Sequence, residues 1–220
     1  MLGQRLIDLS HPICETTPPW PGSPKMEITR LDRAELSTEI QRHSNCSRVA
    51  INIHYATHMD APFHFVSSGK TIDQVPLDWT YGMATLVRLS GQGPGTQVSR
   101  NDLLPWTDSL KRTRKAILQT GWSARWMKPD FFDNYPVISP DAARFLVECG
   151  VHLIGIEMPS VDNAPHDTHM VLLGGECLIV ESLRGLEEIP TDEFLFSATP
   201  LCFQNLDGSP VRAVAIIEQS

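Results

Sequence analysis

The chain has 220 residues, 41% of them hydrophobic and 20% charged, and this composition predicts a single folded domain over residues 1–220. The formal net charge is −8 and the main basic run is KRTRK at 111–115, which argues against a nucleic-acid partner. No apolar run reaches the ~20 residues that span a bilayer, the first residues lack a signal-peptide core, and the five cysteines are scattered, so we expect a cytoplasmic protein without disulfides.

Short apolar runs bounded by turn-forming residues recur along the chain and predict strands. They lie at 5–10, 25–31, 48–53, 84–90, 115–120, 151–156, 177–183, 193–198 and 211–218.

Helices are fewer. Ser139 and Pro140 open the run DAARFLVEC, which Gly150 closes, and this combination of cap, first-turn proline and terminal glycine predicts a helix. The segment 99–110 is a weaker candidate because it contains Pro105, and a short helix is expected at 165–173. Many strands with few helices indicate an α/β or α+β domain built on a mixed, curved β-sheet.

The stretch HYATHMDAPFHF at 54–65 holds three of the chain's eight histidines. His54 and His58 with Asp60 offer two imidazoles and a carboxylate, a workable ligand set for Zn²⁺, Mn²⁺ or Fe²⁺ with a position left for water. Unrelated solvent-exposed histidines on a loop are the alternative interpretation. The pattern is not the HExxH of metalloproteases, and the sequence has no G-x-S-x-G nucleophile elbow.

A metal site here requires the chain to curl. Along a straight strand, residues 54 and 64 would lie about 33 Å apart. We therefore expect the strand at 48–53 to deliver His54 and a tight loop to bring His58 and Asp60 back beside it. Pro62, which has no N–H to donate, favours leaving the sheet ladder at that point.

HYATHMDAPFHF resembles the HxGTHxDAPxHF signature of the cyclase family of metal-dependent hydrolases, which includes bacterial kynurenine formamidase (arylformamidase) and isatin hydrolase. Further blocks resemble that family in the same order: RLIDLSHPI, WPGSP, TGW, GIEMPSVD and HMVLLGGECLIVESL. The resemblance covers nearly the whole chain and implies a swivelling β/β/α-like fold. Ala56 departs from the family's glycine, and because alanine resists a positive φ, the local turn is expected to differ.

The resemblance also implies a set of metal ligands. The positions of His54 and His58 bind one ion, and that of Asp60 bridges to a second. His169 and Glu181 have the family's separation of twelve residues and would complete the pair. An unpaired Glu181 in the apolar run CLIVESL would be costly, and a metal removes that cost.

Other roles follow from the same resemblance. The position of His64 acts as an acid–base group rather than a ligand, and that of Trp20 lines the substrate pocket. His166 lies three residues before His169 and is a rival for the distal ligand. Glu157 and Asp162 are expected to be solvated turn residues rather than supports of the site.

The expected function is hydrolysis of an amide C–N bond in an N-formyl aromatic amine, such as N-formylkynurenine, or in a cyclic amide. Metal-activated water would attack the carbonyl carbon, and His64 would pass a proton to the leaving nitrogen. The expected cofactor is one or two Zn²⁺ per chain, with Mn²⁺ possible, and the expected assembly is a homodimer or homotetramer. The alternatives are a mononuclear Mn²⁺ or Zn²⁺ lactam or lactone hydrolase and a non-catalytic protein with a structural metal.

Overall fold

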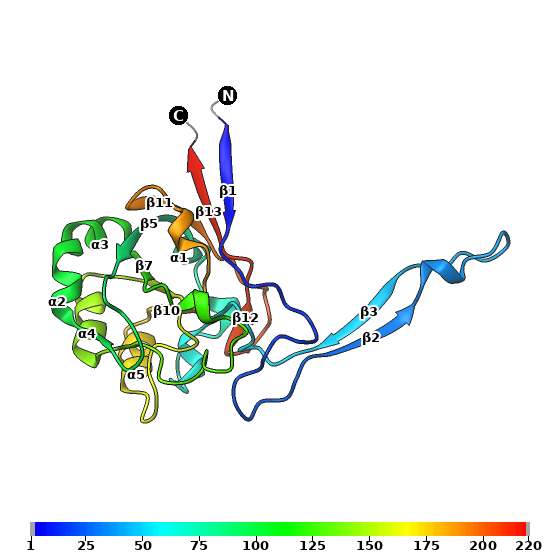
Figure 1. Cartoon of the computed structure of the whole chain (residues 1–220), viewed down its shortest axis with the longest axis horizontal. Coiled ribbons are helices and arrows are strands. Elements are labelled where there is room, and N and C mark those ends of the chain that lie inside the picture. The colour runs from blue at the N-terminus through cyan, green and yellow to red at the C-terminus, as the bar shows by residue number, and fades with distance from the viewer. Residues whose placement is uncertain (1–2, 219–220) are drawn as a thin grey trace.

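A curled nine-stranded mixed sheet organises residues 3–218, the part of the chain that this computed structural model describes (Figure 1). The central strands β5, β7, β9 and β10 run parallel, and the strands towards both edges are antiparallel. In spatial order the strands are β1 (Gln4–Asp8), β13 (Val214–Glu218), β11 (Glu193–Ser197), β5 (Tyr81–Arg88), β7 (Lys115–Gln119), β9 (Leu153–Ile156), β10 (Leu178–Glu181), β4 (His58–Asp60) and β12 (Gly208–Pro210). The expected α/β class with a mixed sheet is confirmed.

The helices are short and lie mainly over one part of the sheet (Figure 1). They are α1 (Leu77–Thr80), α2 (Arg100–Leu103), α3 (Thr107–Thr113), α4 (Pro140–Glu148) and α5 (Asp167–Gly174), with 3₁₀ turns η1 (Ala34–Leu36), η2 (Pro62–His64), η3 (Ile72–Gln74), η4 (Leu104–Trp106), η5 (Trp122–Arg125) and η6 (Leu186–Glu188). Within residues 3–218, none of the helices has the length and hydropathy needed to cross a bilayer.

The helix predictions are confirmed where the local signals are strong. Ser139 caps α4 by accepting a hydrogen bond from the backbone N–H of Ala142 at 3.0 Å. The segment 99–110 is interrupted by a 3₁₀ turn around Pro105, which separates α2 from α3. The helix expected at 165–173 is α5.

Two buried clusters lie on opposite faces of the central strands. On β7, Ala116 and Leu118 pack under the helices, whereas Ile117 packs on the other face with Leu153 of β9. Strands covered on both faces read as continuous apolar runs, as the sequence does at 115–120 and 151–156.

Each predicted strand coincides with an observed one, but the run 48–53 does not extend to its expected end. The strand β3 (Cys46–Ala50) ends at Ala50, and His54 lies on the loop that follows it. His58 and Asp60 then lie on the short strand β4 rather than on a loop, which corrects the expected local structure. The chain leaves the sheet before Pro62, as predicted.

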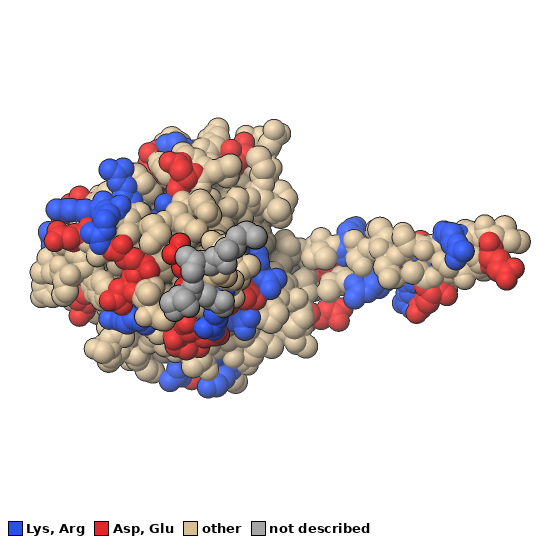
Figure 2. Space-filling view, turned by 90° about the horizontal axis from the view of Figure 1, so that it is seen from above, with Lys and Arg blue, Asp and Glu red and all other residues tan. Residues whose placement is uncertain are grey.

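The strands β2 (Glu27–Asp32) and β3 form a separate two-stranded hairpin that projects away from the body of the molecule (Figures 1 and 2). We call residues 27–50 the arm. The further short strands β6 (Gln97–Val98) and β8 (Val137–Ile138) pair with each other beside the helices.

Candidate metal centre

Strand pairing places the central side chains of the site. In the antiparallel pair of β4 and β10, His58 lies opposite Glu181. Asp60, two residues from His58, shares its face because side chains alternate along a strand. On its other edge β4 pairs with β12, where a Cβ added at Gly208 would lie 2.5 Å from the backbone oxygen of Met59, so this close approach requires glycine.

The carboxylate of Asp60 is the point where the histidines converge. Its Oδ1 lies 2.7 Å from Nδ1 of His54 and 3.2 Å from Nε2 of His58. Its Oδ2 lies 3.9 Å from Nε2 of His169. Asp60 is only 1% exposed, so its charge is compensated by these imidazoles rather than by solvent. A carboxylate that presents both oxygens to different histidines is suited to bridging two cations.

Glu181 closes the other side of the centre. It is 5% exposed and lies 3.5 Å from Nε2 of His58 and 3.7 Å from Nε2 of His169. Burial, reinforced by the negative charge of Asp60, raises the pKa of the Glu181 carboxyl.

Two atoms in this group lack a hydrogen-bond partner. Among the side chains of residues 3–218, the buried nitrogen and oxygen atoms left without one are Nε2 of His11, Nε2 of His58 and Oε1 of Glu181. His58 uses its Nδ1 on the backbone oxygen of Ala56 at 2.9 Å, which leaves Nε2 to face Glu181. Unpartnered buried polar atoms are costly, and a divalent cation between them would satisfy both. The donor set therefore fits a metal ion.

Two groups of potential metal-donor atoms overlap. His58, Asp60 and Glu181 have donor atoms within 4.8 Å of one another, and so do His54, Asp60 and His64. Asp60 belongs to both groups, as a bridging ligand would.

Asp162 orients His169 from behind. Its Oδ1 lies 2.6 Å from Nδ1 of His169 and 3.0 Å from Nδ1 of His166, and its Oδ2 accepts the backbone N–H of Thr168 at 2.7 Å. This arrangement turns Nε2 of His169 towards Asp60, whereas the ring of His166 stays 35% exposed at the pocket edge. A carboxylate behind a histidine ligand is a common support of metal sites. The expectation that Asp162 is a solvated turn residue is wrong, because it is only 7% exposed.

Asp207 is a member of the site that the sequence did not indicate. Its Oδ2 lies 2.6 Å from Nε2 of His54 and 3.4 Å from Nδ1 of His64. It precedes Gly208, so the same strand pairing that needs the glycine brings this carboxylate to the centre. The short run DGSP, an acid followed by turn-forming residues, is the available signal, but 153 residues separate Asp207 from His54.

Neighbouring carboxylates raise the pKa values of two histidines of the site. Burial alone would lower the pKa of His54, but Asp60 and Asp207 raise it to about 9. Burial acts on His169 in the same way, and Asp162 and Glu181 raise its pKa to about 10. Ligands must be deprotonated to bind a metal, so metal uptake at neutral pH would release protons.

This basicity predicts how the metal-free protein responds to pH. Because the folded pKa values of His54 and His169 exceed the ordinary 6.5, their contribution to stability is complete below pH 6.5 and is lost as pH rises through 9 to 10. The melting temperature of chelator-treated protein should therefore fall over this range, whereas metal affinity should increase. Thermal scans of the chelator-treated protein at successive pH values measure the melting temperature. The same scans with added metal report the metal affinity. If the melting temperature of a His54→Ala/His169→Ala variant depends on pH as strongly as that of the wild type, the assignment of this pH dependence to the two histidines is contradicted.

Glu157 is also buried, contrary to the expectation of a solvated turn residue. It is fully buried, and it accepts hydrogen bonds from the backbone N–H groups of Thr120 at 2.6 Å and Gly121 at 2.5 Å and from the hydroxyl of Ser123 at 2.7 Å. Burial raises its pKa, although these donors oppose the shift. Glu157 thus ties the loop after β7 to the end of β9.

Replacing Glu157 by alanine should lower the free energy of unfolding by about 3 kcal/mol, because several buried donors would lose their acceptor. Urea unfolding measures the change. Glu187→Ala, at an exposed carboxylate of η6, is the matched control and should change stability little. Equal effects of the two substitutions would contradict the structural role of Glu157.

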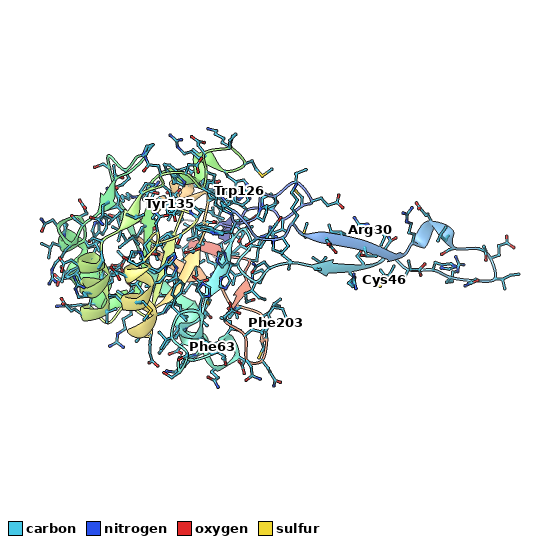
Figure 3. All side chains as sticks on the ribbon, turned by 90° about the horizontal axis from the view of Figure 1, so that it is seen from below. Arg30, Cys46, Phe63, Trp126, Tyr135 and Phe203 are labelled. Carbon is cyan, nitrogen blue, oxygen red and sulfur yellow. The ribbon has the colours of Figure 1, made fainter. Side chains whose placement is uncertain are left out.

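A cavity of about 310 Å³ opens onto these side chains. Its polar wall includes His64, and its apolar wall comes from Pro18, Trp20, Phe65, Trp126 and Phe132. Trp20 is 37% exposed and meets Phe132 edge to face, with ring centroids 5.7 Å apart. Figure 3 shows Trp126 on the side of the body that faces the arm. Aromatic walls around a polar centre suit a flat, partly apolar ligand.

The turn between His54 and His58 keeps a left-handed residue despite the missing glycine. Ala56 has φ of +55°, so alanine adopts the left-handed conformation that it was expected to resist. A non-glycine residue in this conformation costs about 1–2 kcal/mol. The strain lies between two proposed ligands, where the surrounding contacts fix the backbone.

Comparisons with known proteins agree with this geometry. The family model described as "Putative cyclase" matches residues 7–163. The kynurenine formamidase of Geobacillus thermodenitrificans (strain NG80-2) is 33% identical over 216 residues, covering 94% of this chain and 95% of its own. Isatin hydrolase A from Labrenzia aggregata, solved with benzyl benzoate, superposes with a TM-score of 0.85 at 21% identity, covering 98% of this chain and 94% of its own. A solved potential metal-dependent hydrolase with cyclase activity has a TM-score of 0.80 at 24% identity, covering 99% of this chain and all of its own. The two structures show that the fold is shared.

Proposed function

The chain belongs to the cyclase family, and on that premise we propose that it is a metal-dependent hydrolase of amide C–N bonds outside peptides. The observation that carries the proposal is the convergence of buried histidines and carboxylates at the floor of an aromatic-walled cavity. An N-formyl aromatic amine such as N-formylkynurenine is the first candidate substrate, because the 33% identical relative is a kynurenine formamidase. A cyclic amide or lactone opened by a single metal is the second, favoured by the structural likeness to isatin hydrolase.

The proposed ligands are His54, His58, Asp60, His169 and Glu181, and Zn²⁺ or Mn²⁺ suits their mixture of imidazole and carboxylate. A divalent ion held there would supply Lewis acidity and would lower the pKa of a water molecule towards ~7. In this proposal His169 rather than His166 is the distal ligand.

His64 is the proposed acid–base group. Burial lowers its pKa below the ordinary 6.5, which favours the neutral imidazole at pH 7. A neutral imidazole on the cavity wall can accept a proton and pass it to the leaving nitrogen. Asp207, 3.4 Å from Nδ1 of His64, orients the ring.

Trp20 and Phe132 would hold an aromatic substrate. Both line the cavity and meet edge to face, which gives it an aromatic side. An aryl group stacked on this side would place its amide or formyl carbon towards His64 and the proposed ligands.

Location and assembly belong to the same proposal. All five cysteines are free, which suits the reducing cytoplasm. The exposed apolar side chains of the arm support a homodimer or homotetramer.

The test is elemental analysis of protein purified without chelator, followed by parallel assays with N-formylkynurenine and isatin. About two ions per chain with deformylation support the dinuclear formamidase, and about one ion with ring opening supports the lactam hydrolase. Metal without turnover of either compound contradicts the substrate assignment. Failure to bind Zn²⁺ or Mn²⁺ contradicts the metal centre, and with it both hydrolase assignments and the alternative of a structural metal.

A further inference from the structure

A second cavity, of about 610 Å³, adjoins the cavity of the proposed active site. Trp126 lines both cavities, and among residues 3–218 it is the only residue that does so. The first cavity measures about 310 Å³, near the lower end of the roughly 300–1,000 Å³ that small-molecule sites occupy. Trp126 therefore separates a small site from a larger space beside it.

The imidazole of His11 supports the indole of Trp126 from the side of the second cavity. The two rings are stacked, with centroids 4.0 Å apart and planes inclined by 12°. His11 lines the second cavity but not the first, so its ring lies on the second-cavity side of the indole. Burial, with the nearby Arg184, lowers the pKa of His11 to about 4, so at neutral pH the ring stacks as an uncharged aromatic group.

The backbone of His11 is tied to the strands that carry two of the proposed ligands. Its N–H donates to the hydroxyl of Thr57 at 2.9 Å, and that hydroxyl donates to the backbone oxygen of Ser182 at 2.7 Å. Thr57 immediately precedes β4, and Ser182 immediately follows β10. Nε2 of His11 is buried without a hydrogen-bond partner, so the ring contributes its flat face here rather than this nitrogen.

Trp126 continues the aromatic side of the first cavity. Its ring meets Phe131 edge to face, with centroids 5.0 Å apart. Phe131 meets Phe132 in the same way at 5.0 Å, and Phe132 meets Trp20 at 5.7 Å. In the proposed function this side holds the aryl group of the substrate. A substituent that extends the aryl group along this side would therefore meet the indole.

Two carboxylates that line the second cavity already have arginine partners. Oδ2 of Asp8 lies 3.1 Å from Nη2 of Arg184, and Oε2 of Glu188 lies 2.7 Å from Nη2 of Arg5. Pro12 adds an apolar surface to the same lining. Carboxylates that are already paired create little demand for a cationic ligand. The space thus suits a neutral extension of a molecule that is held in the first cavity.

We propose that Trp126, positioned by His11, limits the length of the aryl group that the site accepts, and that removing the indole lets a longer, neutral aryl group enter the second cavity. This inference rests on the proposed function, because it assigns a size limit to the substrates of the same site. Trp126 would touch the substrate, whereas His11 is a positioning residue that acts through Trp126.

The test compares two formamides that differ by one ring, N-formylaniline and N-formyl-4-aminobiphenyl, with enzyme supplied with Zn²⁺. The wild type should prefer the smaller compound. Trp126→Ala should raise kcat/KM for the larger compound relative to the smaller by at least about tenfold, because a steric block to binding is removed. Trp126→Leu, a milder truncation, should shift the ratio in the same direction and replaces the alanine variant if that fails to fold. An unchanged ratio in a folded Trp126 variant would overturn the proposal.

A second stack of tryptophan on histidine provides a matched control. Trp79 lies against His152 with centroids 4.5 Å apart and planes inclined by 2°, and neither residue lines either cavity. Trp79→Ala removes the same side chain from a similar contact and should leave the ratio unchanged. A comparable rise in this variant would trace the effect to general loosening of the fold and would contradict the size limit.

Substitutions of His11 test the positioning role. His11→Ala should raise the ratio partway, because the indole loses the ring stacked on it. His11→Phe should restore the wild-type ratio, because it returns a flat, uncharged ring to the same place. A phenylalanine variant as permissive as the alanine variant would contradict positioning by stacking.

Binding of the free amines separates this inference from the proposed reaction, because calorimetric titration with aniline and 4-aminobiphenyl needs no turnover. A gain of at least about tenfold in affinity for 4-aminobiphenyl in Trp126→Ala, without hydrolysis of either formamide by any variant, would support the size limit and contradict the reaction. Hydrolysis of N-formylaniline by the wild type, without any gain in affinity or turnover for the biphenyl compounds in Trp126→Ala, would support the reaction and contradict the size limit.

Discussion

Replacing Asp60 by asparagine should remove most of the bound metal and lower kcat/KM by about 10³-fold or more. Three histidines approach the Asp60 carboxylate, at 2.7, 3.2 and 3.9 Å. Asparagine keeps the shape of the side chain, but its neutral amide has a single oxygen and cannot bridge two cations. Loss of charge stabilisation by a metal amounts to several kcal/mol in the transition state, which gives the expected factor.

Metal content by elemental analysis and kcat/KM are measured on the same preparations, and circular dichroism confirms folding. Asp78→Asn, at an exposed carboxylate on α1, is the matched control and should retain metal and activity. An Asp60→Asn protein with a full complement of metal would show that Asp60 is not a ligand. His169→Ala then distinguishes a dinuclear from a mononuclear site. Only a dinuclear site should lose an ion when His169 is replaced.

Replacing His64 by asparagine should lower kcat by about 10²–10⁴-fold and leave metal content unchanged. His64 lies on η2, on the cavity wall, and its Nδ1 is 3.4 Å from a carboxylate oxygen of Asp207. Asparagine can still donate a hydrogen bond but cannot carry a proton between water and the leaving nitrogen. The rate should therefore fall through kcat, with a smaller change in KM.

Steady-state kinetics with metal analysis separate this role from that of a ligand. Loss of metal from His64→Asn would make His64 a ligand, consistent with its grouping with His54 and Asp60. An unchanged kcat would assign the proton transfer to another group.

The sequence indicates which side chains converge more readily than it indicates the backbone that holds them. His54, His58 and Asp60 stand out because they lie close together in one short stretch. The strand β4 that carries two of them is only three residues long, too short for alternation to reveal it. Its partner β12 is equally short, and so Asp207 could not be anticipated.

The sequence also did not predict that the acidic residues Glu157 and Asp162 are buried. Glu157 and Asp162 lie around the end of the strand predicted at 151–156, where solvated turn residues are typical. The acceptors of Glu157 are used instead by donors on another segment, Thr120 and Gly121, and those of Asp162 by His169 on the helix that follows it. The hydrogen bonds of Glu157 are a property of the folded chain and leave no local pattern in the sequence.

The residues of the site lie on two kinds of backbone, paired strands and loops. The proposed ligands Asp60 and Glu181 stand on paired strands, whereas Trp20, Trp126 and Phe132 belong to loops. Loops tolerate insertion and substitution far better than paired strands do. Descendants of this chain, or variants selected in the laboratory, could thus acquire new substrates by exchanging loop residues while inheriting the reactive centre unchanged.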